Sequence, residues 1–187
     1  KIKSRKPTIA AEFDTHVEQS LDGDFFDQYD VVGIDGLTLM GDAIMEEVLY
    51  LNGRAGQFPQ QDDYGPQMIA INNITKALAG RVPTFFMTAH EELVKDEISG
   101  KIQNEILTTG KLRIRLPALF SEIYHCECRS TEKDEKFVIQ TRPNRENPLI
   151  RCTLKGLEMF EDVTIDWSKP MESQGLGHIL QQTKRRQ

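Results

Sequence analysis

The sequence of 187 residues lacks several features that would each define a class of protein. Only three cysteines are present, and Cys126 and Cys128 form a C-x-C pair with no second Cys or His pair at zinc spacing. We therefore expect alternating strand residues there rather than a metal site. An odd number of cysteines in a chain that shows no secretory leader favours a reducing, cytoplasmic compartment.

Long apolar runs, an excess of positive charge and interleaved aromatic residues are also missing. No stretch approaches the length of a membrane span, so no membrane partner is expected. The formal net charge of −6 argues against bulk attraction to nucleic acid, although it leaves room for a local basic strip. Aromatic residues do not interleave with basic ones, so the sequence shows no stacking platform of the kind that oligonucleotide-binding barrels carry.

The most informative segment that is present runs from Tyr29 to Asp35 and on to Thr38. This short apolar run predicts a central strand buried on both faces of a parallel sheet. Asp35 would then lie at the carboxyl edge of the sheet, where open α/β folds bind ligands. A carboxylate there is suited to hold Mg²⁺ or its water beside a nucleotide phosphate. The pattern is that of a Walker B strand, but the glycine-rich phosphate loop that usually accompanies it is absent from these residues.

Hydrophobic periodicity predicts the elements around this strand. Helical spacing of apolar residues predicts helices over 8–21, 42–51 and 64–80. Strand patterns predict a second buried strand over 82–89, a half-exposed strand over 112–116, and a hairpin that pairs 122–129 with 136–142. The charged segment 92–110 fits a helix, a mobile loop or both, and a short helix is expected within 154–160. Two strands joined through helices form a right-handed βαβ unit, so an α/β fold is expected.

Seven segments occur in the order expected of phage RecA-like P-loop ATPases, and the chain resembles that family over roughly residues 8–145. The family comprises phage nucleotide-binding proteins related to RecA and RadA, some of which act as single-strand annealing ATPases. The resemblance implies a three-layer RecA-like fold with a mostly parallel central sheet and a C-terminal antiparallel hairpin. It also implies an ATPase core over 1–150 and a C-terminal extension or arm over 151–187. The segments that carry it are Tyr29–Asp35, Asp63–Gly65, Phe86–Glu91, Lys95–Glu97, Gly110–Arg113, Leu116–Phe120 and Ile139–Pro143.

The resemblance implies roles for single residues at the ends of the two buried strands. Asp35 resembles the Walker B aspartate, which orients Mg²⁺ through water, and Thr38 would contribute to nucleotide binding. Thr88 and His90 stand where the family places a polar sensor. His90 would bond the γ-phosphate or the attacking water and report hydrolysis to the following loop.

Three cations and one segment are implied to act between subunits. Lys111, Arg113 and Arg142 match positions that could reach across a subunit boundary and stabilise charge on the transferred phosphoryl group. Residues 92–110 would form a mobile loop facing a central channel where DNA binds. The expected protein therefore binds and hydrolyses ATP with Mg²⁺ and acts in phage DNA recombination or replication. It would bind single-stranded DNA and assemble into a ring or filament in the host cytoplasm.

Other interpretations of the same residues remain open at this point. Asp35 could cap the helix that follows, and His90 could be an interior histidine bonded to a carbonyl. The cations could be solvated side chains, or, for Arg142, a salt-bridge partner. The loop 52–64 could face DNA or a partner, or be a linker.

The whole chain also has alternative functions. It could be a non-hydrolysing scaffold or a DNA-binding protein that keeps the fold without the phosphate loop. A two-metal nuclease would need clustered carboxylates. The adjacent pairs Asp62–Asp63 and Asp134–Glu135 make no convincing metal cup, because neighbouring strand residues point to opposite faces.

Overall fold

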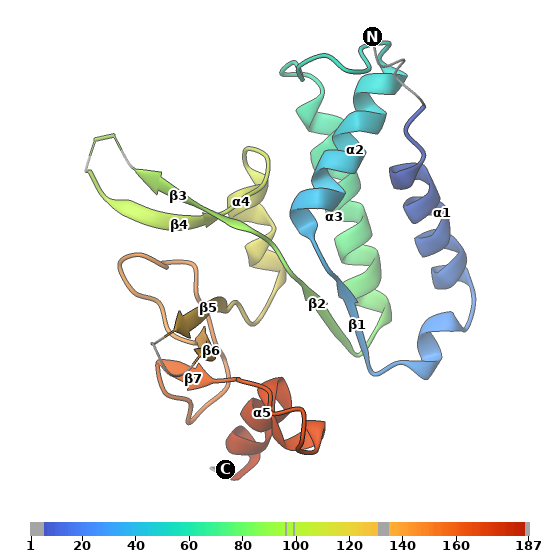
Figure 1. The fold of residues 1–187 in the computed structure, drawn as a ribbon. Coiled ribbons are helices and arrows are strands. Elements are labelled where there is room, and N and C mark those ends of the chain that lie inside the picture. Colours follow the sequence, from blue (N-terminus) through green and yellow to red (C-terminus); the bar gives the residue numbers. More distant parts are fainter. Residues whose placement is uncertain (1–5, 96, 99, 131–134, 186–187) are drawn as a thin grey trace. The chain divides into compact units, whose positions relative to one another are not determined.

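The computed structural model describes residues 6–95, 97–98, 100–130 and 135–185. The helices are α1 Ile9–Asp22, α2 Leu37–Leu51, α3 Tyr64–Arg81, α4 Leu112–Arg115 and α5 Gly175–Arg185 (Figure 1). The strands are β1 Val31–Ile34, β2 Thr84–Met87, β3 Glu91–Lys95, β4 Ile102–Ile106, β5 His125–Ser130, β6 Glu135–Gln140 and β7 Phe160–Asp162. Short 3-10 turns cover Phe25–Gln28, Pro117–Leu119 and Met171–Ser173. The expected mixed α/β class is confirmed.

The described strands form three small sheets rather than the mostly parallel central sheet that we expected. β1 pairs with β2 in parallel, β3 pairs with β4, and β5, β6 and β7 form an antiparallel sheet. The physical reason lies in the connections. Parallel neighbours need a long crossover, and α2 and α3 provide one between β1 and β2. After β2 the connections are shorter. A short segment joins β3 to β4, another joins β5 to β6, and the strands of each pair are direct neighbours.

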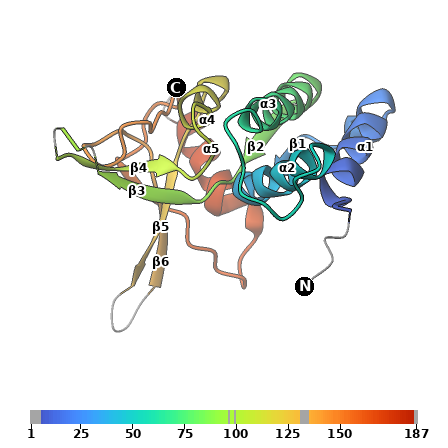
Figure 2. The ribbon, with the colours of Figure 1, turned by 90° about the horizontal axis from the view of Figure 1, so that it is seen from above.

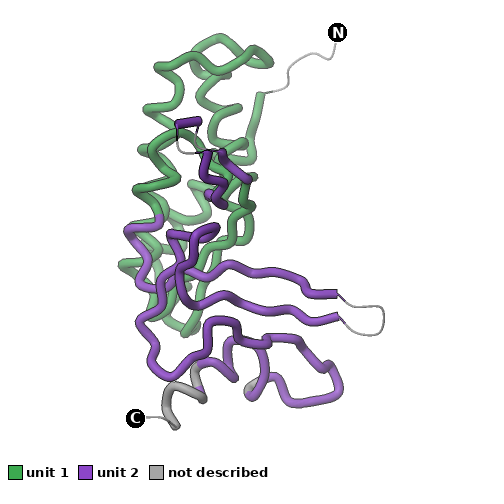
Figure 3. Tube along the Cα trace, turned by 90° about the vertical axis from the view of Figure 1, so that its left-hand side faces the viewer, with its two compact units in different colours: residues 1–92, 106–116 green, residues 93–105, 117–187 purple. Residues whose placement is uncertain are grey.

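The chain divides into two compact units (Figure 3). Unit 1 comprises residues 1–92 and 106–116, and unit 2 comprises residues 93–105 and 117–187. Unit 1 contains the parallel strand pair, and unit 2 contains the three-stranded sheet. The domain boundary near residue 150 stays a prediction.

In unit 1, α1 packs against α2 and α3, and α3 packs against β2 (Figure 2). Helical periodicity predicted α1 and α3 well, because one side of each is apolar and buried, whereas α2 begins at Leu37, ahead of the expected range 42–51. Leu37, Ile44 and Leu49 face the core from α2, and Ile71 and Leu78 face it from α3.

Strand β1 is not buried on both faces, so that expectation is wrong. Ile34 is buried, whereas Val31 is 53% exposed, and the residues between them alternate in burial. Alternate residues of a strand point to opposite faces, and one face of this strand pair is covered while the other is open. On the open face the ring of Phe86 lies against Gly33, where a Cβ atom would overlap it.

The segment expected as a half-exposed strand over 112–116 is helix α4. Leu112 and Leu116 are buried, and their spacing of four residues is one helical turn. Ile114, which completed the apparent alternation, is 68% exposed. The period-two pattern was therefore misleading, because a run of five residues fits both periods.

Unit 2 confirms the expected hairpin and departs from the other expectations for the C-terminal part. β5 pairs with β6 from His125↔Gln140 to Ser130↔Glu135. The helix expected within 154–160 is not found, and β7 begins at Phe160. Helix α5 lies in the tail, and its Ile179 is buried with Ile139 and Leu157 in a small core.

Candidate functional site

Asp35 and Thr88 follow two adjacent parallel strands at the same edge of the sheet. β1 and β2 are in register through Ile34↔Met87, so the next residues of both strands emerge together. The Thr88 N–H donates to the Ile34 carbonyl at 3.0 Å, and the Leu37 N–H donates to the Thr88 carbonyl at 2.9 Å. These bonds extend the ladder past the strand ends and fix both segments where α/β folds bind ligands.

The side chains of these two residues are bonded to each other. The Thr88 hydroxyl donates to Asp35 Oδ1 at 2.5 Å, and the Gly36 N–H donates to the Thr88 hydroxyl oxygen at 2.9 Å. The hydroxyl therefore has a fixed donor direction and a fixed acceptor direction. Gly36 has φ of 102°, a left-handed conformation that favours glycine. The carboxylate is held in one place and is exposed.

Asp35 does not cap the helix that follows. Helix α2 begins at Leu37, its N-cap residue is Gly36, and no side chain bonds the free N–H groups there. The alternative interpretation of Asp35 as a helix cap is therefore not what the structure shows. Its bond is made across the sheet, to a residue 53 positions later in the chain.

Thr38 links the same edge to the chain that follows β2 and β4. Its hydroxyl donates to the Leu107 carbonyl at 3.1 Å and accepts a long bond of 3.4 Å from the His90 N–H. The Leu107 N–H in turn donates to the His90 carbonyl at 2.8 Å. The His90 side chain is exposed and not interior. The structure thus brings four predicted residues together: Asp35, Thr38, Thr88 and His90.

The three predicted cations are placed differently. Lys111 is exposed just before α4, and Arg113 Nε donates to the Gly110 carbonyl at 3.1 Å. Arg142 belongs to unit 2, where its guanidinium donates to the Leu157 carbonyl at 2.8 Å. In the described part of the chain, no hydrogen bond or ion pair joins Lys111 or Arg142 to the four residues above.

A cavity of about 480 Å³ adjoins Thr38 and was not predicted from the sequence. It lies between the first turns of α2 and α3 and the segment 107–110, and no lysine or arginine lines it. Gln67 is buried in its wall and donates from Nε2 to the Gly41 carbonyl at 2.7 Å. Gln67 Oε1 has no partner among the described residues. Segments far apart in the sequence form this cavity, so no local sequence motif predicts it.

Asp63 closes the loop between α2 and α3. It is fully buried and accepts bonds from Asn52 Nδ2 at 2.8 Å, from the Gln60 N–H at 2.7 Å and from the Arg54 guanidinium. Burial alone would raise the pKa of Asp63, but the bonds from Gln60 and Asn52 and the charge of Arg54 outweigh it. The pKa of this carboxyl therefore lies below its usual range. Asp63 is thus a structural group at the base of loop 52–64, and it is not a nuclease ligand.

Cys152 lies in a second polar cluster, in unit 2. The Tyr124 hydroxyl donates to Glu122 at 2.8 Å and lies 3.7 Å from the Cys152 sulfur. Burial, followed by the neighbouring Glu122, raises the pKa of the Cys152 thiol. A nucleophilic cysteine needs a lowered pKa, so this thiol is not a candidate nucleophile.

Comparisons with models of protein families, with curated proteins and with solved structures find no match. Across the described ranges, no three His, Cys, Asp or Glu side chains gather as metal ligands, and none of the helices there has the length and apolar character to cross a membrane. The chemistry at the edge of β1 and β2 therefore carries the functional argument.

Proposed function

We propose that this chain carries the metal-facing and water-facing part of an ATP site, and that the intact protein binds and hydrolyses ATP. The observation that carries the proposal is the Asp35–Thr88 bond at the carboxyl ends of two adjacent parallel strands. An exposed carboxylate fixed by a neighbouring strand is pre-organised for a charged ligand, because it needs no rearrangement to bind. The resemblance to phage RecA-like ATPases supports a role in DNA recombination or replication, in the host cytoplasm.

The donor set at this edge fits Mg²⁺. Asp35, Thr88 and Thr38 offer oxygen atoms, which this ion prefers. A single carboxylate is enough, since Mg²⁺ at nucleotide sites keeps several waters and takes further oxygens from the phosphates. When bound, the ion would neutralise charge on the phosphate oxygens.

The protein's own residues would position the reactants. Thr88 would hold the Asp35 carboxylate in its orientation, and the exposed His90 side chain would bond the attacking water or the γ-phosphate. Water would attack the γ-phosphate directly, with no covalent intermediate. His90 and Thr38 are both hydrogen-bonded to Leu107, so a change at the γ-phosphate on hydrolysis would be transmitted to the end of β4.

The remaining parts of the proposal concern other subunits. Lys111 immediately precedes the short helix α4 and Arg113 lies on it, and from there they would reach a neighbouring subunit in a ring or filament. Arg142 would have to exchange its bond to the Leu157 carbonyl for one to a phosphate. Single-stranded DNA is the proposed polymer partner.

A second function is favoured by one specific observation. The sequence contains no glycine-rich loop ending in Gly-Lys-Ser or Gly-Lys-Thr. A non-hydrolysing scaffold or DNA-binding protein with the same fold would need no such loop. It would bind no nucleotide at Asp35.

The test compares, in the intact protein, the two aspartates that flank strand β1. Asp35→Asn should lower Mg²⁺-dependent ATP turnover by about 100-fold or more, because a charge that faces the developing phosphate charge and its counter-ion is lost. Asp30→Asn is the matched control, since Asp30 lies at the opposite end of β1 and its carbonyl bonds Thr84. It should leave turnover within about twofold. Unchanged turnover in Asp35→Asn, with an intact circular dichroism spectrum, would refute the proposal.

A further inference from the structure

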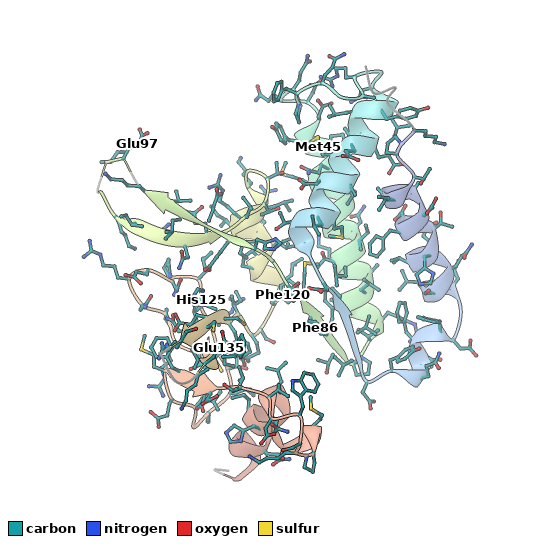
Figure 4. The ribbon with its side chains drawn as sticks, viewed as in Figure 1. Met45, Phe86, Glu97, Phe120, His125 and Glu135 are labelled. Atoms are coloured by element: carbon teal, nitrogen blue, oxygen red, sulfur yellow. The ribbon has the colours of Figure 1, made fainter. Side chains whose placement is uncertain are left out.

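The hairpin formed by β3 and β4 displays aliphatic side chains. Leu93 is 73% exposed, Ile102 is 52% exposed, and Ile98, between the strands, is 99% exposed. Glu97, which precedes Ile98 in the sequence, stands at the tip (Figure 4). Three large aliphatic groups on one exposed hairpin are unusual for a surface that faces water alone, because exposed strand edges with apolar residues tend to pair.

The hairpin is held at its base, so these side chains do not belong to a frayed segment. The Asn104 N–H donates to the Glu146 carbonyl, and Asn104 Nδ2 donates to Asn147 Oδ1, both at 2.7 Å. Asn147 then donates to the buried Gln140 at 2.7 Å. A chain of bonds from the three-stranded sheet therefore fixes β4, while the aliphatic groups of the hairpin stay outside that network.

The charge of the hairpin is the wrong sign for a nucleic acid. Residues 91–105 contain five acidic side chains and two lysines. Affinity for a phosphate backbone depends on cations, and each added carboxylate opposes it. The expectation that 92–110 faces DNA is therefore not supported by its charge, which instead favours a basic protein surface.

A complementary surface exists on the same chain. Residues 107–120 contain Lys111, Arg113 and Arg115 and no acidic residue. Leu112 and Leu116 are buried, which turns Ile114 outward with 68% exposure beside the exposed Arg115. We call Lys111, Ile114 and Arg115 the α4 patch. The α4 patch presents one aliphatic side chain flanked by cations. It is therefore complementary to the hairpin, whose aliphatic side chains are flanked by carboxylates.

We infer that the β3–β4 hairpin of one copy docks on the α4 patch of a second copy. The inference rests on the self-association included in the proposed function and names the surfaces that produce it. Two different surfaces meet head to tail, so an open assembly keeps one free hairpin at one end and one free α4 patch at the other. It therefore grows into an open filament or closes into a ring. The proposed contact involves one hairpin and one short helix, and interfaces below the standard size of about 800 Å² per partner are weak and transient, so we expect association on the order of micromolar.

The experiment uses two variants that each remove one surface. Leu93→Ser with Ile98→Ser alters the hairpin, and Ile114→Ser with Arg115→Glu alters the α4 patch. Leu51→Ser is the matched control, since Leu51 is 72% exposed at the end of α2. Sedimentation velocity is measured over a concentration series without nucleotide. The unaltered chain and the control should assemble beyond a dimer, and each variant alone should self-associate at least about tenfold more weakly.

The mixture of the two variants is the decisive sample. It should form dimers and nothing larger, because one intact hairpin meets one intact α4 patch. A charge exchange checks that lost assembly is not caused by lost folding. Glu97→Lys and Arg115→Glu should each weaken self-association when made alone, and the chain that carries both changes should regain it. Unchanged assembly in both variants, or a monomeric unaltered chain, would overturn the inference. So would a hairpin variant that assembles normally but no longer binds a single-stranded oligonucleotide. Asp35→Asn should assemble normally, so a failed ATPase proposal would show itself separately.

Discussion

The Thr88 hydroxyl is the residue-scale feature on which the geometry of the site depends. It bonds the Asp35 carboxylate and accepts the Gly36 N–H, so it joins the two strand ends. Thr88→Val should lower ATP turnover by about 10- to 100-fold, the cost of one hydrogen bond to a charged group. Thr88→Ser keeps the hydroxyl and should restore most of the turnover.

The same pair of variants separates positioning from packing. A merely structural threonine would be replaced by valine with little effect on turnover, since the two side chains have similar shapes. Equal turnover in Thr88→Val and Thr88→Ser, both folded by circular dichroism, would therefore contradict a positioning role.

Gly33 is required for space and not for backbone conformation. Its φ is not in the left-handed region, and an added Cβ would overlap the Phe86 ring. Gly33→Ala should destabilise the fold by about 1–3 kcal/mol, the usual cost of overpacking. Urea unfolding measures it. Gly80→Ala, a position in α3 with nothing near the added Cβ, should instead stabilise by about 0.5–1 kcal/mol.

A double variant tests whether the Phe86 ring causes the loss of stability in Gly33→Ala. In a Phe86→Ala background, Gly33→Ala should cost nothing, because the overlapping atoms are gone. A cost that persists there would mean that the strand backbone itself requires glycine.

Some site residues could be predicted from the sequence and others could not, for a physical reason. Asp35 and Thr88 each end an apolar run, and strand ends meet at one edge, so their proximity follows from the pattern. The Leu107 carbonyl and the buried Gln67 act through contacts between distant segments. No periodicity encodes such contacts. Gly36 could have been found, because an Asp-Gly pair before a helix often marks a left-handed turn.

At the scale of elements, the long amphipathic helices were predictable and the short segments were not. The ranges expected for α1 and α3 agree with the structure within one or two residues. Helix α4 was misread because Leu112, Ile114 and Leu116 alternate, although the two buried residues are one turn apart. Most of segment 92–110 forms the β3–β4 hairpin. Pairing of the two strands satisfies the hydrogen-bonding groups of the backbone without a buried apolar face.

The loop between α2 and α3 is an element whose stability should depend on pH. The folded-state pKa of Asp63 is depressed, so its contribution is fully present above the unfolded value of about 4. That contribution is lost as the pH falls through the folded-state pKa. Acid unfolding should therefore steepen below about pH 4 in the natural chain.

Two neighbouring aspartates make this prediction specific. Asp63→Asn should lower the melting temperature by about 5 °C or more at neutral pH and flatten the acid dependence. Asp62→Asn should do neither, because the Asp62 side chain is 80% exposed. Identical thermal melts for the two variants across the pH series would contradict the structural role of Asp63.

At the scale of the whole molecule, the topology departs most from expectation. The sequence pattern indicates two strands joined by helices, and the structure places them in parallel in unit 1. The sequence pattern does not indicate which strand is the last one to pair in parallel. After β2, β3 pairs with β4 and β5 pairs with β6 across short connections, and β7 joins β6 after the longer segment 141–159. Unit 2 has its own core of Ile139, Leu157 and Ile179. The candidate site therefore lies at the edge of one strand pair in unit 1.

The most direct measurement replaces Mg²⁺ by paramagnetic Mn²⁺ and records amide NMR signals of the intact protein with ATP. Line broadening should be strongest at Gly36, Thr38 and Thr88, weaker at Thr84 at the far edge of the sheet, and lost in Asp35→Asn. Broadening centred elsewhere, or the same broadening in Asp35→Asn, would contradict an ATP-bound metal at this carboxylate.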